Sequence, residues 1–199
     1  MIMNIFEVWS MKMPYRRRMI ENVTAKYFRE LATDISGKKV LEIGCGHGFG
    51  ALSIKINFSP SKIVATDLDP RMIASAKKMA IDPSISFEVA DATKLPYENA
   101  GFEAVFEYGA IHHIPGPLWK TCLDEIYRVL SPKGKVYIYD ISIESFTTFF
   151  GRINRLITSH PYDSMYKKSE LLDYLKLLGF KIIKEVSLGR YFVIIAEKN

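Results

Sequence analysis

The sequence predicts a doubly wound α/β fold, in which a mostly parallel sheet carries helices on both faces. Short apolar runs alternate along the chain with segments of helical periodicity. The first apolar run, residues 39–43, stops at a turn with glycine at every second position: Gly44, Gly46 and Gly48. A second run, about twenty residues further on, ends in the carboxylate of Asp67. Parallel strands end at one edge of a sheet, so this pair of features is typical of a nucleotide-type cofactor site.

The remaining elements follow from the same alternation. Strands are expected at residues 39–43, 62–67, 85–89, 102–107 and 134–140, and helices at residues 48–57, 70–80 and 117–130. In the last of these helices the apolar residues recur at helical spacing, namely Leu118, Cys122, Ile126 and Val129. Pro132 and Gly134 are expected to end it.

The C-terminal part predicts a helix and a hairpin. Residues 169–178 form the helix, and Gly179 is placed to stop it. Two apolar runs at 180–186 and 191–196 are joined by residues 187–190, which predict a turn. A closing antiparallel hairpin is not a feature of dinucleotide dehydrogenases. The sequence contains no internal repeat and no low-complexity linker, so we expect a single domain.

The glycine turn favours a cationic cofactor over a phosphate. A dinucleotide site would place a third glycine at the position that Phe49 occupies here. The charged neighbour of the turn is an acid, Glu42, whereas a phosphate would favour a basic group. S-adenosylmethionine fits this arrangement because it carries a sulfonium and an ammonium group but no phosphate.

Five stretches in order resemble the motifs of class I S-adenosylmethionine-dependent methyltransferases. They are LEIGCGHG at 41–48, ATDLDPRM at 65–72, EVADATKLPY at 88–97, FEAVFE at 102–107 continuing to HHI at 112–114, and LDEIYRVLSPKGK at 123–135. The resemblance covers about residues 37–140 and is closest to the small-molecule branch that includes the ubiquinone/menaquinone C-methylases. It implies a Rossmann-like sheet of order 3-2-1-4-5-7-6 whose last strand is antiparallel.

The resemblance also implies a set of cofactor-binding residues: Glu42, Gly44, Cys45, Gly46, Gly48, Asp67, Leu68, Met72, Asp91, Ala92 and Glu107. In the family the glycine turn passes under the methionine moiety, and the acid at position 42 supports it. Asp67 would accept the ribose hydroxyls beside Leu68, and Asp91 would accept from the adenine amino group. Taken singly, each has a simpler interpretation as a tight turn, a helix cap or a loop residue.

The expected function is methyl transfer to a small, apolar or aromatic acceptor. In-line transfer from a sulfonium mainly requires alignment of donor and acceptor, which can supply about 7–11 kcal/mol. A general base is needed only where the acceptor must lose a proton. His112 and His113 follow the fourth strand and are the candidate catalytic residues, although either could instead pack or cap a helix.

Composition excludes several other classes. Apolar residues make up 48% and charged residues 25% of the 199-residue chain, which fits a folded domain with a sizeable core. No apolar run approaches the length of a membrane span. Glu7 and Lys12 interrupt the N-terminal region, so export is not expected. Cys45 and Cys122 lie far apart in different elements, so a disulfide is not expected, and the predicted location is the cytoplasm.

Two segments outside the core are expected to select the acceptor. Residues 1–36 place Tyr15, Met19, Ile20, Val23, Tyr27 and Leu31 on one helical face. Residues 142–168 carry a second apolar stripe of Phe146, Phe149, Phe150, Ile153 and Ile157. We predict that both segments form a lid over the acceptor, around a core at 37–140 and a final helix and hairpin at 169–199. The alternative is that these stripes pack on the sheet.

The remaining expectations concern metals and partners. The histidines lack ligand spacing, so no metal is expected. A net charge of +5 raises RNA or protein methylation as an alternative, but the basic residues are scattered and only residues 16–18 form a tight run. A membrane-peripheral enzyme that methylates a lipid-like quinone is a further alternative. A small-molecule acceptor is preferred, nucleic acid is disfavoured, and a homodimer is compatible with the aromatic stripes.

Overall fold

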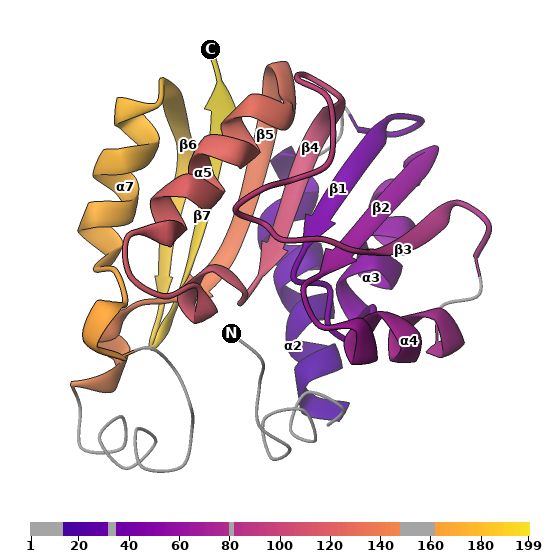
Figure 1. Cartoon of the computed structure of the whole chain (residues 1–199), viewed down its shortest axis with the longest axis horizontal. Coiled ribbons are helices and arrows are strands. Elements are labelled where there is room, and N and C mark those ends of the chain that lie inside the picture. The colour runs from indigo at the N-terminus through magenta and orange to yellow at the C-terminus, as the bar shows by residue number, and fades with distance from the viewer. Residues whose placement is uncertain (1–13, 32–34, 80–81, 148–161) are drawn as a thin grey trace.

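The computed structural model describes residues 14–31, 35–79, 82–147 and 162–199. Within these ranges a seven-stranded sheet has the order β3-β2-β1-β4-β5-β7-β6 (Figure 1). The strands are β1 Lys39–Ile43, β2 Lys62–Asp67, β3 Ile85–Val89, β4 Phe102–Tyr108, β5 Leu130–Ile141, β6 Phe180–Leu188 and β7 Tyr191–Lys198. Strands β1 to β5 pair in parallel, and β7 is antiparallel to both β5 and β6. The predicted fold class, strand order and antiparallel last strand are confirmed.

The helices lie close to their expected positions. They are α2 Pro14–Val23, α3 Phe49–Phe58, α4 Pro70–Met79, α5 Leu118–Val129 and α7 Lys168–Leu177. Shorter turns complete the described chain: η1 Thr24–Phe28, η2 Arg29–Leu31, η3 Ile111–His113, η4 Ile143–Phe146 and η5 Tyr162–Ser164. Helix α5 ends one residue before the expected boundary because Leu130 is already extended and pairs with Phe102 of β4.

The sheet is buried on both faces, which explains why its parallel strands are almost continuously apolar. On one face Val40 packs with residues of α2 and α3, while on the other Leu41 and Ile43 pack with α5 and α7. Figure 1 shows α5 and α7 in front of the sheet, with α2 and α3 on the opposite side. The two layers hold the strands rigidly and fix where their carboxyl ends meet.

The C-terminal elements follow their local signals. The backbone N–H of Lys167 donates to the Glu170 carboxylate over 2.9 Å and so closes the start of α7. Gly179 follows the helix with φ +97°, the left-handed conformation that glycine adopts at low cost. Gly189 and Arg190 form the two-residue turn between β6 and β7. The predicted helix stop and hairpin are therefore present.

The N-terminal segment differs from the predicted stripe after Val23. Residues 24–28 form a π turn, which holds more residues per turn than an α-helix and shifts the faces that follow. Phe28 is consequently fully buried against the rings of Phe106, Tyr108 and Tyr137. Tyr15, expected on the apolar face, is 59% exposed. Ile20 and Val23 pack on the sheet, as the alternative to a lid proposed.

The second predicted lid segment is described only at its ends. Phe146 is buried against the ring of Tyr162. The other predicted members of the stripe, Phe149, Phe150, Ile153 and Ile157, lie outside the described residues. The lid role of both segments therefore stays a prediction.

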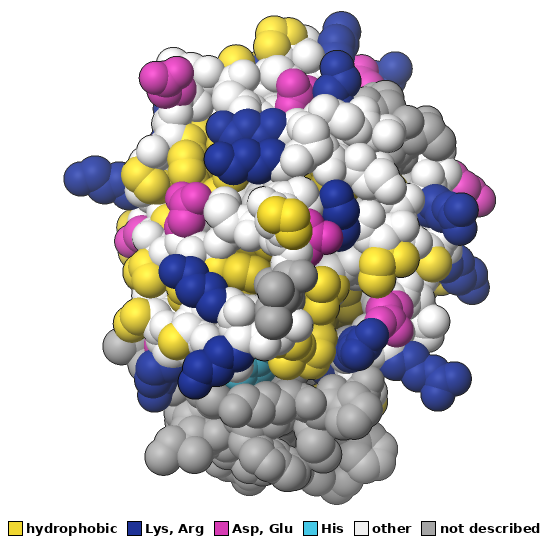
Figure 2. All heavy atoms as spheres, turned by 90° about the vertical axis from the view of Figure 1, so that its right-hand side faces the viewer, with side chains coloured by type: hydrophobic (Ala, Val, Ile, Leu, Met, Phe, Trp, Pro, Cys, Tyr) yellow, Lys and Arg dark blue, Asp and Glu magenta, His cyan; other side chains and the backbone are white. Residues whose placement is uncertain are grey.

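Surface charge is dispersed on the face built around β3, α3 and α4. Figure 2 shows Lys and Arg side chains there in separate groups, interspersed with acidic and hydrophobic side chains. Among the exposed apolar residues of the described chain are Leu68, Met79 and Val89. No helix within the described ranges has the length and hydrophobicity needed to cross a membrane.

Candidate functional site

A cavity of about 230 Å³ opens at the carboxyl ends of β1, β2 and β4. This edge is the point where the strand order reverses, the usual binding crevice of open α/β sheets. The residues that line it are Ile43, Gly44, Thr66, Asp67, Leu68, Ala90, Asp91, Ala92, Thr93, Gly109, Ala110, His113, Ile114, Pro115 and Leu118.

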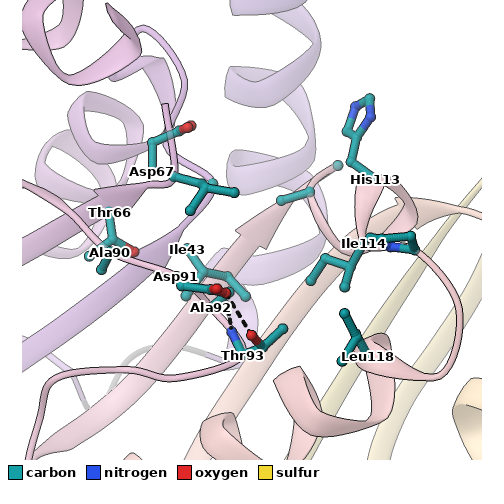
Figure 3. A pocket seen from close by; sticks show the side chains of 15 residues that line it. Ile43, Thr66, Asp67, Ala90, Asp91, Ala92, Thr93, His113, Ile114 and Leu118 are labelled. Atoms are coloured by element: carbon teal, nitrogen blue, oxygen red, sulfur yellow. Dashed lines mark hydrogen bonds between the residues drawn. The ribbon is translucent and has the colours of Figure 1, made fainter. Parts of the chain in front are cut away.

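The cavity has two chemically different sides. Figure 3 shows Asp67 and Asp91 on one side, with His113, Ile114 and Leu118 on the other. We call the first side, Gly44, Asp67, Leu68, Asp91 and Ala92, the acidic wall. We call the second side, His113, Ile114, Pro115 and Leu118, the apolar wall.

Gly44 holds the two loops at the bottom of the cavity together. Its φ is +65°, and a Cβ atom added there would overlap the Cβ of Ala110, far inside van der Waals contact. The loop after β1 and the loop after β4 can meet only because this position has no side chain. Gly48, with φ +85°, also has little space, since an added Cβ would lie 3.0 Å from the Phe87 ring.

Glu42 supports the glycine turn from behind the cavity. Its side chain is 1% exposed and accepts a hydrogen bond from the backbone of Ala51, in the first turn of α3. The carboxylate occupies the space beside Gly50, where any Cβ would overlap Glu42 Oε1. Burial raises the pKa of Glu42 to about 8, and the nearby charge of Asp67 contributes to this rise.

Asp67 ties the end of β2 to the glycine turn. Its Oδ2 accepts from the Gly46 N–H over 2.9 Å, and its Oδ1 accepts from the Asp69 N–H over 2.9 Å. Burial raises the pKa of Asp67, while these two backbone donors partly oppose the rise. A carboxylate offers about four lone-pair sites, so it can accept further hydrogen bonds from a ligand in the cavity.

Asp91 is held in a tight local turn on the same wall. Its Oδ1 accepts from both the N–H and the hydroxyl of Thr93, over 2.8 and 2.7 Å (Figure 3). Leu68, 47% exposed, and the small Ala92 complete the lining around these two carboxylates. An exposed apolar side chain beside two acceptors suits a flat, partly polar ring.

A buried polar cluster stands behind the apolar wall. His112 donates to Asp140 through its backbone N–H over 3.0 Å and through Nδ1. Tyr166 donates its hydroxyl to the same carboxylate over 2.6 Å. Asp140 is fully buried at the end of β5, so these donors replace the water that its charge would otherwise require. The His112 and His113 rings lie 4.1 Å apart, and only His113 lines the cavity.

Glu107 fixes the loop that carries this wall. It is fully buried, and its Oε1 accepts from the backbone N–H groups of Ala110 and Ile111. Its Oε2 has no hydrogen-bond partner in the described part of the chain. Burial raises the pKa of the Glu107 carboxyl, and the charge of Asp140 raises it further.

The predicted site residues therefore divide into two groups. Gly44, Asp67, Leu68, Asp91, Ala92 and His113 line the cavity. The others lie behind it rather than on its surface: Glu42, Cys45, Gly46, Gly48, Met72, Glu107 and His112. Met72 is 1% exposed because it lies on the core-facing side of the amphipathic α4. Contact between any of these residues and a cofactor stays a prediction.

Sequence reasoning missed Asp140, Tyr166 and Gly50. Asp140 closes an apolar strand with an acid, the same signal that revealed Asp67, and could have been found. Gly50 continues the glycine series by one further step but lies inside a helix, where a glycine is easily overlooked. Tyr166 carries no local signal, since its partner is 26 residues away in the chain.

The residues present fit S-adenosylmethionine. The two loops meet at glycine and alanine, leaving backbone rather than side chains at the bottom of the cavity. Glu42 Oε2, which supports the glycine turn, has no hydrogen-bond partner among the described residues, and no Lys or Arg of those residues lines the cavity. These carboxylates accept hydrogen bonds, so they favour a cationic ligand with hydroxyl donors over a phosphate. Both cysteines are buried free thiols, and no metal-binding group of His, Cys, Asp or Glu occurs in the described ranges.

The strand order, the glycine turn after β1 and the acid at the end of β2 define a class I S-adenosylmethionine-dependent methyltransferase fold. A family model for the methyltransferase domain matches residues 40–134, which is just under half of the chain. The predicted resemblance is confirmed over these residues. The predicted enzyme class, a methyltransferase, stays a proposal for the whole protein.

Three comparisons place the chain among known proteins. A phthiotriol/phenolphthiotriol dimycocerosates methyltransferase of Mycobacterium leprae is 34% identical over 108 residues, covering 54% of this chain and 39% of the relative. A fatty-acid O-methyltransferase of Mycolicibacterium smegmatis is 35% identical over 101 residues, covering 51% and 36%. The chain thus spans under half the length of these relatives. The structure of a methyltransferase from Aquifex aeolicus is similar in fold, with a TM-score of 0.76 at 19% identity, covering 98% of this chain and 99% of that one.

Proposed function

We propose that this protein transfers a methyl group from S-adenosylmethionine to an apolar, lipid-like small molecule. The observation that carries the proposal is the cavity at the switch point of the sheet, with carboxylates on one wall and apolar side chains on the other. The acidic wall suits the adenosyl part of the methyl donor, and the apolar wall suits an apolar methyl acceptor.

The chain's own contribution to the donor site is orientation. Asp67 would accept the ribose hydroxyls and Asp91 the adenine amino group, with Leu68 against the ring. When bound, the cofactor supplies a methyl group on a positively charged sulfur, which leaves as a neutral thioether. The backbone of Gly44 and Gly109 would pass close to that end of the ligand because neither residue has a side chain to prevent it.

The acceptor class rests on the apolar wall and on the relatives. Ile114, Pro115 and Leu118 form an apolar surface that offers little to a charged polymer. The two relatives named above are methyltransferases of a phthiotriol-type lipid and of a fatty acid. An oxygen atom on a long apolar chain is therefore the acceptor that we favour over RNA, protein or an aromatic quinone.

We assign a general-base role to His113 where the acceptor oxygen must lose a proton. His113 lines the cavity and can contact the acceptor, whereas His112 is fixed behind it by Asp140. An imidazole titrates near neutral pH and is suited to this step. The neighbouring His112 ring, 4.1 Å away, would then limit the orientations that His113 can adopt. The free, buried thiols are consistent with our further proposal of a cytoplasmic location.

Calorimetric titration tests the donor site. We expect S-adenosylmethionine and S-adenosylhomocysteine to bind and NAD not to bind. Asp67→Ala should weaken both adenosyl ligands at least tenfold, or about 1.4 kcal/mol. Asp82→Ala is the matched control, because Asp82 makes the same carboxylate-to-backbone turn with Ser84 but does not line the cavity. A folded wild-type protein that binds neither adenosyl ligand would refute the proposal.

Transfer of a labelled methyl group tests the acceptor. Oleic acid, a long-chain phenol, bulk transfer RNA and casein are supplied in parallel with the labelled donor. We expect label in both lipid-like acceptors. His113→Ala should lose most of the label in the long-chain phenol, which must give up a proton, but not in oleic acid, which is already ionised, at unchanged donor affinity. Label that enters only RNA or casein would exclude a lipid-like acceptor and favour the macromolecular alternative.

A further inference from the structure

Arg16 of α2 reaches the edge of the cavity. Its Nη2 lies 3.4 Å from the position that a Cβ on Gly109 would take, and His112 Cε1 lies 3.6 Å from the same position. Gly109 lines the cavity and has φ +76°, so no side chain separates the guanidinium from this corner. Figure 1 shows α2 at the end of the sheet where β1 and β4 finish.

The three consecutive arginines of α2 have different surroundings. Arg17 is exposed and its Nε donates to Glu21 over 2.8 Å, a pair within the helix. Arg18 lines a separate surface groove with Met19 and Asn22. Arg16 is half-buried, and no carboxylate of the described residues accepts a hydrogen bond from it or pairs with it. The run that looks uniform in sequence thus contains one arginine that is turned toward the cavity.

Two buried acids of the neighbouring strands β4 and β5, Glu107 and Asp140, accept hydrogen bonds from groups other than Arg16. Asp140 accepts from His112 and Tyr166, and Glu107 accepts from the loop backbone. Tyr139 stacks on Tyr191 with ring centres 5.0 Å apart, and the charge of Arg16 partly opposes the rise that burial causes in the Tyr139 pKa. Within the described residues, the corner therefore combines an arginine that pairs with no carboxylate and an aromatic pair.

An arginine in this setting is suited to a carboxylate ligand. Its planar fork matches the two oxygens of a carboxylate, and partial burial strengthens the interaction. A half-buried guanidinium that lacks an internal acid also gains more from an incoming anion than an exposed one.

We propose that Arg16 binds a ligand carboxylate at the Gly109 corner of the cavity. This inference rests on the proposed function and adds a specificity residue to it. The carboxylate has two possible sources: the amino-acid end of the methyl donor, or a fatty-acid acceptor. The chemistry at Arg16 is the same for both, and the ligands can be chosen to separate them.

The first arm of the test compares two adenosyl ligands by calorimetry. S-adenosylhomocysteine carries the amino-acid carboxylate, and 5′-methylthioadenosine lacks it. If the donor is the source, Arg16→Gln weakens S-adenosylhomocysteine at least tenfold and leaves 5′-methylthioadenosine unchanged. Arg17→Gln, one residue away on the same helix, should change neither affinity. Arg16→Lys keeps the charge without the fork and should give an intermediate loss.

The second arm adds the acceptor. Decanoate and decanol are titrated into protein saturated with S-adenosylhomocysteine. If the acceptor is the source, Arg16→Gln weakens decanoate at least tenfold and leaves decanol unchanged. Near-identical thermal unfolding of Arg16→Gln and wild type shows that the variant is folded.

The inference is overturned if S-adenosylhomocysteine binds Arg16→Gln as it binds wild type and decanoate binding does not depend on Arg16. This outcome is distinct from failure of the proposed function, in which the wild-type protein itself binds neither adenosyl ligand. That result would remove both proposals together.

Discussion

The two walls of the cavity are built by opposite means. The acidic wall is shaped by backbone: Gly44 has no side chain, and Asp67 is held by peptide N–H groups. The apolar wall is shaped by side chains, supported by a buried cluster in which Asp140 accepts from His112 and Tyr166. Adding an atom to a glycine should therefore disrupt the acidic wall. Removing a hydrogen-bond partner should disrupt the apolar wall.

Replacing Glu42, behind the acidic wall, should cause the largest change in stability among these variants. Its pKa is about 8 in the folded protein and 4.5 as a reference value, so between these pH values the folded state binds the additional proton. The stability of the wild type should therefore fall as pH rises from about 4.5 through 8, by roughly 4–5 kcal/mol relative to Glu42→Gln. Urea unfolding of both proteins from pH 4 to 9 measures this difference. Parallel stability curves would contradict it.

Variants of Asp140 test the apolar wall, which depends on buried hydrogen bonds. Asp140→Asn keeps the shape but removes the charge that holds His112 and Tyr166, and should lower the free energy of unfolding by about 3 kcal/mol. Tyr166→Phe removes a single donor from the same carboxylate and should cost only about 1 kcal/mol. Equal losses in the two variants, measured by urea unfolding, would show that Asp140 is not the centre of this cluster.

Gly50 tests whether atoms can be added behind the acidic wall. Gly50→Ala would place a methyl group on Glu42 Oε1 and within 2.9 Å of the Tyr108 ring, for a loss of about 2–3 kcal/mol. The double variant Gly50→Ala with Glu42→Ala opens space for that methyl group and should be less destabilised than the sum of the single changes. If the losses of unfolding free energy in the two single variants simply add up in the double variant, the proposed overlap between the methyl group and Glu42 is wrong.

Gly44 and Gly189 separate steric overlap from backbone strain. Both have φ close to +65°, but a Cβ at Gly44 overlaps Ala110 while nothing lies within 4 Å of one at Gly189. Both Ala variants should lose about 1 kcal/mol of stability through φ strain, and Gly44→Ala should lose more because of the overlap with Ala110. Only Gly44→Ala should in addition weaken S-adenosylhomocysteine, at least tenfold by calorimetry. Similar ligand affinity in the two variants would mean that the meeting of the two loops is not required.

The contrast between the walls also explains what the sequence could predict. Gly44 and Asp67 act through local backbone geometry directly after a strand, so their spacing was sufficient to place both at one edge of the sheet. The strand order followed from a resemblance carried by the same local motifs. The second wall depends on pairs that are distant in sequence, such as Tyr166 with Asp140 and Arg16 with Gly109, which only the packed fold brings together.

The helical segment shows a further limit. A periodicity of 3.6 residues placed Tyr15 and Tyr27 on the apolar face; Tyr27 packs against the core, but Tyr15 is 59% exposed. The periodicity missed Phe28, which the π turn at 24–28 brings into the core. No residue in this turn is a Gly or Pro that would signal the irregularity. The core around Phe28 determines it: the buried ring contacts three aromatic residues of the sheet.

The π turn also sets the rotational phase of α2. Each residue of an α-helix turns the helix by about 100°, so the length of residues 24–28 decides which arginine of the 16–18 run meets Gly109. With Phe28 held in the core, we expect deletion of one residue from this turn to rotate α2 by about 100° and to move Arg16 away from Gly109. The length of this turn thus controls which side chain faces the cavity, without any change in the residues that line it.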